Sequence, residues 1–269
     1  MKGVVWLNGA LCPADKAYVS VADRGLTLGD GLFETFRVDK GKLLHIGLHM
    51  ARLQAGSMVL ALPVPEQDVV EQAAASLLGA LNIEQGSARL TVTRGAGPRG
   101  VAPPAQSQPT VFMTASEGAS VPADVTLITS QLVRQDELSV LCQFKTLNYL
   151  PSILARQEAV KAGAGDALIL NTKGRVAETT VSSVLVQKAG RFLTPSQKEG
   201  ALPGVACAVL RQKGLLDDVV LTREDLIQAD AVYLVNALSL RCVTSLDGMP
   251  LRQDRNGFYR VCKELSLIT

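Results

Sequence analysis

The most informative stretch of the sequence is Leu141-Cys142-Gln143-Phe144-Lys145-Thr146-Leu147-Asn148-Tyr149-Leu150, which holds a single lysine. Its neighbours are apolar or neutral, and the nearest acidic residue, Glu137, lies eight positions away. An apolar environment without a carboxylate partner disfavours the charged form of a lysine, and the neutral amine is a nucleophile. Lys145 is therefore a candidate for covalent chemistry, although a surface lysine on a strand edge fits the same local pattern.

A second candidate is Glu178, which lies between two apolar segments in Arg175-Val176-Ala177-Glu178-Thr179-Thr180-Val181-Ser182-Ser183. An acid in an exposed turn would look the same. A lysine that forms a Schiff base with pyridoxal phosphate (PLP), however, needs a carboxylate opposite the ring nitrogen. It also needs backbone N–H groups at a helix start for the phosphate, usually with an arginine. Pro203-Gly204-Val205-Ala206 opens a predicted helix and Arg52 lies on another, so one chain supplies all four parts.

Length and composition limit the class of protein. The 269 residues are 47% hydrophobic and 19% charged, which predicts one large or two smaller folded domains. A formal charge of +2, with one Trp, four Tyr and six Phe, argues against a nucleic-acid partner. Apolar runs such as Met58–Val64 and Ala231–Val235 are far shorter than the roughly 20 residues that span a bilayer. We therefore expect neither nucleic acid nor a membrane as partner.

The cysteines and histidines indicate the compartment and argue against a metal. Five widely spaced cysteines without a CxxC pair are typical of reduced thiols, and the N-terminus lacks the long apolar core of a signal peptide. We expect a cytoplasmic protein. His45 and His49 have the spacing of half a zinc-protease motif, but Ile46 occupies the position of its glutamate. We expect no metal, and for these histidines packing and hydrogen bonding at a helix start.

Gly95-Ala96-Gly97-Pro98-Arg99-Gly100 matches the G-x-G-x-x-G pattern of dinucleotide-binding domains. That motif works only where its last glycine opens a helix whose N-terminus binds the pyrophosphate. Pro98 interrupts this loop, and Val101–Pro109 contains three prolines in nine residues. We therefore predict a long loop between antiparallel strands, one that could line a site.

Hydrophobic spacing and turn signals predict a mixed α/β chain in two domains. The first 45 residues are expected to form strands with tight turns, including hairpins at Asn8-Gly9 and Asp39-Lys40-Gly41-Lys42. Residues 116–124, rich in Ser, Gly, Pro and Ala, predict a linker between domains 1–115 and 125–269. Helices are predicted from about His45 to before Pro63, from about Pro65 to Leu81, and over Pro151–Ala162, Gly204–Lys213 and Arg223–Ala229. Strands are predicted at Val4–Leu7, Phe33–Val38, Ala88–Thr93, Thr110–Thr114, Ala167–Asn171, Ser183–Gln187 and Ala231–Val235.

Seven landmarks, in this order along nearly the whole chain, resemble the class IV aminotransferases, the PLP enzymes of fold type IV. That family includes branched-chain and D-amino-acid aminotransferases and 4-amino-4-deoxychorismate lyase. The landmarks are Asp23-Arg24-Gly25 with Gly29-Asp30-Gly31-Leu32-Phe33-Glu34-Thr35, His49-Met50-Ala51-Arg52-Leu53, Thr93-Arg94-Gly95-Ala96-Gly97-Pro98-Arg99-Gly100, Lys145-Thr146-Leu147-Asn148-Tyr149, Glu178-Thr179-Thr180, Leu202-Pro203-Gly204-Val205-Ala206 and Asn236-Ala237-Leu238.

The resemblance implies a role for each candidate. Lys145 would be the Schiff-base lysine and the general base once it is released, and Glu178 would pair with the pyridine nitrogen of PLP. Arg52 would bind the cofactor phosphate together with the backbone N–H groups of Val205 and Ala206.

The resemblance also implies two further cofactor contacts and an assembly. Tyr149 would lie near the phenolic oxygen of PLP, and Asn236 near the phosphate. The chain has Ser183 where the family commonly has Asn, which leaves the hydrogen bonding there open. The implied fold is D-amino-acid aminotransferase-like: a smaller N-terminal and a larger C-terminal domain, with the site in the cleft between them. Members are homodimers in which a loop of one subunit reaches the site of the other.

Among the activities of this family, the short chain and the runs Gly-Asp-Gly-Leu-Phe-Glu-Thr, Lys-Thr-Leu-Asn and Thr-Arg-Gly-Ala-Gly-Pro-Arg-Gly favour the lyase, which releases pyruvate and 4-aminobenzoate for folate synthesis. The Lys-Thr-Leu-Asn run also fits D-amino-acid aminotransferases, so it does not separate the two activities by itself. Arg99 would then bind a substrate carboxylate, since an arginine fork suits carboxylates, unless it is a solvated loop residue. Arg94, the other arginine of this loop motif, could equally have a structural role. An aminotransferase acting on branched-chain L-amino acids or D-amino acids remains open, as does a non-catalytic binding protein on the same fold.

Overall fold

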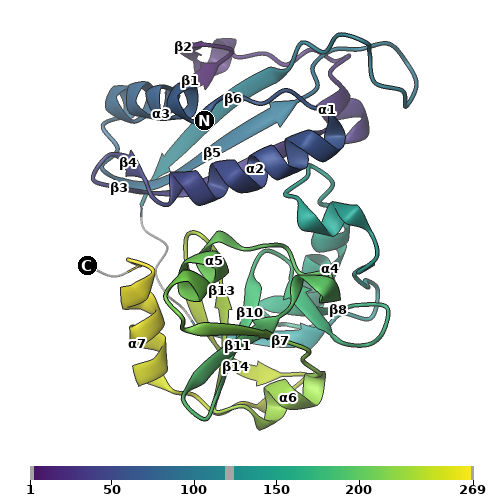
Figure 1. Ribbon diagram of the computed structural model, residues 1–269, viewed down its shortest axis with the longest axis vertical. Helices are drawn as coiled ribbons and strands as arrows, with labels where there is room; N and C mark the ends of the chain where they lie inside the picture. The colour runs from purple at the N-terminus through teal and green to yellow at the C-terminus, as the bar shows by residue number, and fades with distance from the viewer. Residues whose placement is uncertain (1–2, 119–123, 268–269) are drawn as a thin grey trace. The chain divides into compact units, whose positions relative to one another are not determined.

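The computed structural model describes residues 3–118 and 124–267. Figure 1 shows the chain, which divides into two compact units: Met1–Ser120 with Phe144–Asn148, and Val121–Gln143 with Tyr149–Thr269. The short segment Phe144–Asn148, expected in the C-terminal domain, thus belongs to the N-terminal unit. Of the predicted linker, residues 119–123 lie outside the described residues, and residues 116–117 continue a strand.

The described part of the N-terminal unit is one antiparallel sheet with helices. Its strands are β1 (Val4–Leu7), β2 (Ala10–Pro13), β3 (Gly31–Asp39), β4 (Lys42–Leu43), β5 (Gln85–Thr93) and β6 (Thr110–Glu117), and its helices are α1 (Arg24–Leu28), α2 (Ile46–Leu60) and α3 (Gln67–Leu81). The strand order is β2-β1-β6-β5-β3-β4. A short 3-10 helix at Ala14–Lys16 follows β2.

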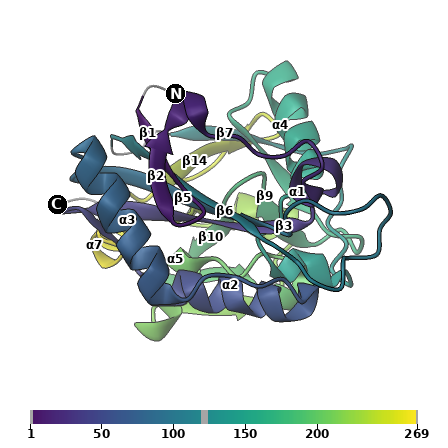
Figure 2. The same cartoon turned by 90° about the horizontal axis from the view of Figure 1, so that it is seen from above.

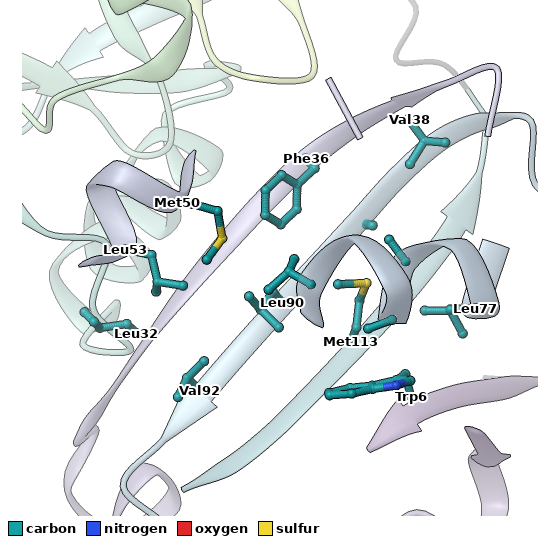
Figure 3. Close-up of a cluster of buried hydrophobic side chains, with 14 of the residues drawn as sticks. Trp6, Leu32, Phe36, Val38, Met50, Leu53, Leu77, Leu90, Val92 and Met113 are labelled. Carbon is teal, nitrogen blue, oxygen red and sulfur yellow. The ribbon is translucent and has the colours of Figure 1, made fainter. Parts of the chain in front are cut away.

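Helices α2 and α3 lie on the same face of this sheet, as Figures 1 and 2 show. Alternation along the strands turns every second side chain toward the helices. Figure 3 shows the resulting core, in which Phe36 of β3 and Leu90 of β5 lie near Met50 of α2 and Met113 of β6. Phe36 is completely buried, and its ring centroid lies 4.6 Å from that of His49.

The described part of the C-terminal unit is a larger mixed sheet. Its strands are β7 (Val125–Thr129), β8 (Asp166–Leu170), β9 (Val176–Thr179), β10 (Ser183–Lys188), β11 (Arg191–Pro195), β12 (Leu216–Val219), β13 (Ala231–Val235), β14 (Leu240–Leu246) and β15 (Met249–Pro250). They are ordered β12-β11-β10-β13-β14-β7-β8-β9, with β15 paired to β14. The pairs β11–β12, β14–β7 and β7–β8 are parallel.

The helices of this unit are α4 (Leu150–Lys161), α5 (Val205–Gln212), α6 (Arg223–Gln228) and α7 (Arg255–Glu264), with short 3-10 helices at Val140–Gln143 and Gln197–Glu199. Helix α4 packs on β8 through its buried alanines, Ala155 and Ala159, which lie in one cluster with Ala167 and Ile169. Small side chains on this face allow the helix to approach the sheet closely.

The predictions for the hairpins and for the Gly-rich loop are confirmed, and the prediction for the first 45 residues is wrong in one respect. The hairpins at Asn8-Gly9 and at residues 39–42 are present, and the loop after Thr93 joins antiparallel strands. The first 45 residues, however, also contain a helix, α1. Its N-terminus is capped by Asp23, whose Oδ1 accepts a hydrogen bond from the Gly25 N–H at 2.7 Å.

A buried ionic cluster joins α2 to the centre of β3. Glu34 of β3 is completely buried, and its carboxylate accepts two hydrogen bonds from Arg52, at 2.8 and 2.6 Å. The Nδ1 atom of His49 lies 2.7 Å from Glu34 Oε2. Burial opposes ionisation of Glu34, but Arg52 and the hydrogen bond with His49 outweigh it and lower its pKa to about 2.

The depressed pKa of Glu34 makes the stability of the protein depend on acid pH. The stabilisation is complete above the ordinary glutamate pKa of 4.5 and is lost as the pH falls toward 2, because the unfolded chain then binds the proton more readily. We expect wild-type stability to fall by about 2 kcal/mol more than that of Glu34→Gln between pH 6 and pH 3, measured by urea denaturation. Exposed Glu84→Gln should keep the wild-type dependence. An unchanged dependence in Glu34→Gln contradicts this account.

Candidate active site

Lys145 is positioned by backbone pairing with β3. The Phe33 N–H donates to the Lys145 carbonyl at 2.9 Å, and the Leu147 N–H donates to the Gly31 carbonyl at 3.1 Å. The short segment therefore extends along β3 like an additional strand. The Lys145 side chain is half-buried, and its Nζ lies 4.3 Å from the ring centroid of buried Phe33.

The ring of Phe33 contacts a second cation. The guanidinium carbon of Arg89 lies 3.5 Å from the same ring centroid. The negative face of an aromatic ring attracts cations, so Phe33 gathers two positive groups at one place on the sheet. Such a place favours an anionic group.

His49 and Arg52 meet at the Glu34 carboxylate described above. Burial lowers the pKa of His49, an effect that Glu34 opposes and that the charges of Arg52 and Lys145 reinforce. A neutral imidazole with its proton on Nδ1 therefore donates to Glu34, so the contact is a hydrogen bond between a neutral ring and a carboxylate. The predicted hydrogen-bonding role of His49 is confirmed. The Nε and one terminal nitrogen of Arg52 are held by Glu34 in a forked pair, which fixes the direction of the guanidinium.

In the C-terminal unit, Glu178 lies on β9 and is half-buried. Its Oε2 accepts a hydrogen bond from the Leu202 N–H at 3.3 Å. Leu202 begins the turn that leads into α5, so the carboxylate and the start of this helix are tied together. Glu178 is thus an acceptor of defined orientation and does not lie in an exposed turn.

The start of α5 offers backbone donors. The first N–H groups of a helix have no partner within it, and the N-cap residue Gly204 has no side chain to cap them. An added Cβ at Gly204 would lie 2.7 Å from Ser183 Oγ, so a larger residue here would displace this hydroxyl. Val205 and Ala206, the first two residues of α5, are both buried. This geometry suits an anion such as a phosphate.

Asn236 lies directly after β13. Its side-chain amide donates to Ser182 Oγ at 3.2 Å, and its Oδ1 accepts from the Leu238 and Ser239 N–H groups at 2.9 and 3.0 Å. These bonds hold the turn between β13 and β14 against the end of the β9–β10 turn. Tyr149 is half-buried and directly precedes α4.

The two arginines of the Gly-rich loop differ in their surroundings. Arg99 is exposed. Arg94 is buried; its Nε donates to Asp30 at 2.7 Å, and its terminal nitrogens donate to the carbonyls of Ala61 and Leu60 at the end of α2. Arg94 therefore has a structural role, and Arg99 remains the candidate for substrate binding.

The sequence singled out two members of the Glu34 cluster, Arg52 as a phosphate ligand and His49 as a hydrogen-bonding residue, but gave Glu34 no role. The signal was present: a glutamate at a core-facing position of an otherwise apolar strand, Gly31-Leu32-Phe33-Glu34-Thr35-Phe36, needs a buried partner.

The candidate residues form two donor sets. Lys145, Arg52 and Arg99 belong to the N-terminal unit, and Glu178, Tyr149, Val205, Ala206 and Asn236 belong to the C-terminal unit. The first set offers an amine and two guanidinium groups, and the second a carboxylate and helix-terminal N–H groups. Among the described helices of the protein, none is both long and apolar enough to cross a membrane.

The chain resembles known proteins over most of its length. Residues 31–246 match the family model for amino-transferase class IV. A provisionally named branched-chain-amino-acid aminotransferase of Methanocaldococcus jannaschii is 31% identical over 94% of this chain and 91% of its own length.

Two solved structures share the fold over nearly their full length. The 4-amino-4-deoxychorismate lyase of Pseudomonas aeruginosa is 31% identical, with a TM-score of 0.84, over 96% of this chain and 98% of that one. The branched-chain amino acid aminotransferase of T.th., complexed with N-(5'-phosphopyridoxyl)-L-glutamate, is 25% identical, with a TM-score of 0.88, over 98% of this chain and 93% of that one. The family model covers most of the chain, and the protein belongs to the class IV aminotransferase family.

Proposed function

We propose that the protein is a PLP-dependent lyase that converts 4-amino-4-deoxychorismate into 4-aminobenzoate and pyruvate. The observation that carries the choice of lyase is the 31% identity to the Pseudomonas aeruginosa enzyme over 98% of that chain. The match covers nearly all of both chains, which agrees with the short length and the motifs that favour the lyase. Transamination of branched-chain or D-amino acids is the second candidate, and the equally high identity to the Methanocaldococcus jannaschii protein favours it.

The residues of the two donor sets fit the parts of PLP. The Lys145 amine would attach the aldehyde, and the Glu178 carboxylate would accept the hydrogen bond of the protonated ring nitrogen. Arg52 and the N–H groups of Val205 and Ala206 would bind the phosphate, since both a guanidinium and an uncapped helix start suit this anion. Tyr149 and Asn236 would complete the contacts, near the phenolic oxygen and the phosphate.

When bound, PLP acts as an electron sink for the carbon next to the substrate amine. Lys145, displaced by that amine, would then remove the proton from this carbon with its Nζ. Glu178, oriented by the Leu202 N–H, would keep the ring nitrogen protonated throughout. Arg99 would hold a substrate carboxylate. In the substrate, loss of this proton and cleavage of the ether bond to the three-carbon side chain release pyruvate and leave an aromatic ring.

We also propose that the protein is a homodimer. Helix α4 exposes Leu150, Ile153, Leu154 and Val160, whose spacing puts them on one face. The preceding segment exposes Leu138, Val140 and Leu141. Large apolar side chains gathered in one exposed segment are typical of an interaction surface, and a second copy of this chain would cover it.

The first test concerns the cofactor. Protein purified with PLP should show the visible absorbance of the lysine-bound cofactor, and Lys145→Ala should lose it, because the substitution removes the amine that attaches the aldehyde. The exposed lysine of the Lys173–Glu137 ion pair provides a control, and Lys173→Ala should keep the band. Glu178→Gln should keep the band but lose about a hundredfold or more in turnover. A wild-type protein without the band would support the non-catalytic alternative.

The second test separates the two reactions. The holoenzyme is incubated with 4-amino-4-deoxychorismate, and pyruvate and 4-aminobenzoate are measured. Parallel incubations with D-alanine and L-leucine, each with a keto-acid acceptor, measure amino-group transfer. We expect equal amounts of pyruvate and 4-aminobenzoate, because one ether bond is cleaved per ring. Transfer from leucine or alanine without 4-aminobenzoate would replace the lyase by the aminotransferase.

The third test concerns assembly. Light scattering coupled to size exclusion should give the mass of two chains for the wild type. Leu154→Glu should shift the protein toward one chain, because a charge on the apolar face of α4 disfavours its burial. Val220→Glu changes an equally exposed apolar residue outside this segment and should remain dimeric. A monomeric wild type at all concentrations would refute the dimer.

A further inference from the structure

A buried arginine holds the loop that joins β5 to β6. Arg24, the first residue of α1, donates from Nη1 to the Gly100 carbonyl at 2.8 Å and to the Ala102 carbonyl at 3.3 Å. Its Nη2 donates to the Val101 carbonyl at 2.8 Å. One guanidinium thus binds three consecutive carbonyls, directly after Arg99.

The guanidinium is itself anchored. Arg24 Nε donates to Asp30 Oδ2 at 2.8 Å, and the same oxygen accepts from Arg94 Nε at 2.7 Å. Burial opposes ionisation of Asp30, but Arg94 and Arg24 outweigh it and lower its pKa, so the carboxylate stays charged. Because Arg94 also holds the end of α2, Arg24 cannot turn away without breaking a buried network.

The beginning of the loop lies directly on Arg24. The Arg24 N–H donates to the Gly95 carbonyl at 2.9 Å, and the Gly97 N–H donates to the Ala22 carbonyl at 3.2 Å. A Cβ at Gly97 would lie 2.9 Å from Arg24 Cδ, so only glycine allows this contact. The loop is therefore fixed on both sides of Arg99, while the arginine itself remains exposed.

We propose that Arg24 is a positioning residue, which holds the loop of residues 95–109 in the conformation from which Arg99 binds the substrate carboxylate. This inference rests on the proposed function of Arg99. A loop without these hydrogen bonds would populate many conformations. Substrate binding would then have to order the loop, and the entropy lost in doing so would weaken the affinity for substrate. The expected signature is a weaker affinity for substrate with little change in the rate of the chemical step.

The first measurement does not depend on enzyme activity. Trypsin cleaves after arginine and requires a mobile segment, so the Arg99–Gly100 bond reports directly on the clamp. In Arg24→Lys, a single ammonium nitrogen with three N–H groups cannot replace the four hydrogen bonds to Asp30 and the three carbonyls, and cleavage at this bond should accelerate about tenfold or more. Arg191→Lys alters an exposed arginine–aspartate pair on β11 and should cleave like the wild type. Equal cleavage rates in Arg24→Lys and the wild type would overturn the proposal.

A second variant guards against misfolding. Gly97→Ala keeps Arg24 but pushes a methyl group against its side chain, and should accelerate the same cleavage. Circular dichroism and the rate of cleavage at other sites show whether either variant is folded. If both folded variants leave the Arg99–Gly100 bond as protected as in the wild type, the clamp does not exist.

The kinetic measurement tests positioning itself. Arg24→Lys and Arg99→Ala should each raise KM for the carboxylate substrate about tenfold, with kcat changed much less. The double variant should be no worse than Arg99→Ala, because Arg24 acts only through Arg99. If the effects of the two substitutions on KM add in the double variant, or if cleavage is faster without a change in KM, Arg24 has only a structural role. A protein that never binds PLP would refute the proposed function instead, while the proteolysis still reports on the clamp.

Discussion

The pairing of Phe144–Asn148 with β3 is the constraint on which the rest of the account depends. Two backbone hydrogen bonds, from Phe33 N–H and from Leu147 N–H, fix Lys145 beside the first residues of this strand. The same strand carries Phe33, which contacts the lysine, and Glu34, which holds Arg52 and His49. Alternation along β3 therefore turns Phe33, beside the Lys145 amine, and Glu34, in the buried cluster, toward opposite faces of the sheet.

The buried Glu34 cluster shows how the fold orients a charged side chain. A buried carboxylate is costly unless it is paired, and here the forked hydrogen bonds of Arg52 and the neutral ring of His49 satisfy it. The same contacts fix a guanidinium in one orientation. In the C-terminal unit a hydrogen bond likewise orients a carboxylate, because the Leu202 N–H donates to Glu178. The N-cap of α5, Gly204, follows two residues later and has no side chain to cap the helix.

Much of the fold was predictable because its signals are local. Asn8-Gly9 sets a hairpin, Pro63 follows a helix, and the prolines after Arg99 exclude a helix from the Gly-rich loop. Helix α7 was missed although Asp254 caps it and Phe258, Val261 and Cys262 repeat at helical spacing. Lys145 and Glu178 were singled out from local chemistry. Two other features depend on long-range contacts that no local pattern encodes. One is the pairing of Lys145 with Phe33, which lies more than a hundred residues away, and the other is the set of hydrogen bonds from Arg24 to the carbonyls of Gly100–Ala102.

The most direct test of the central claim locates the covalent bond. The PLP-loaded protein is reduced with borohydride and digested with trypsin, and the peptides are analysed by mass spectrometry. The account predicts a phosphopyridoxyl group on Lys145, found in the uncleaved peptide of residues 135–156, because the modified lysine resists trypsin. Labelling of another lysine, or of none, would contradict it.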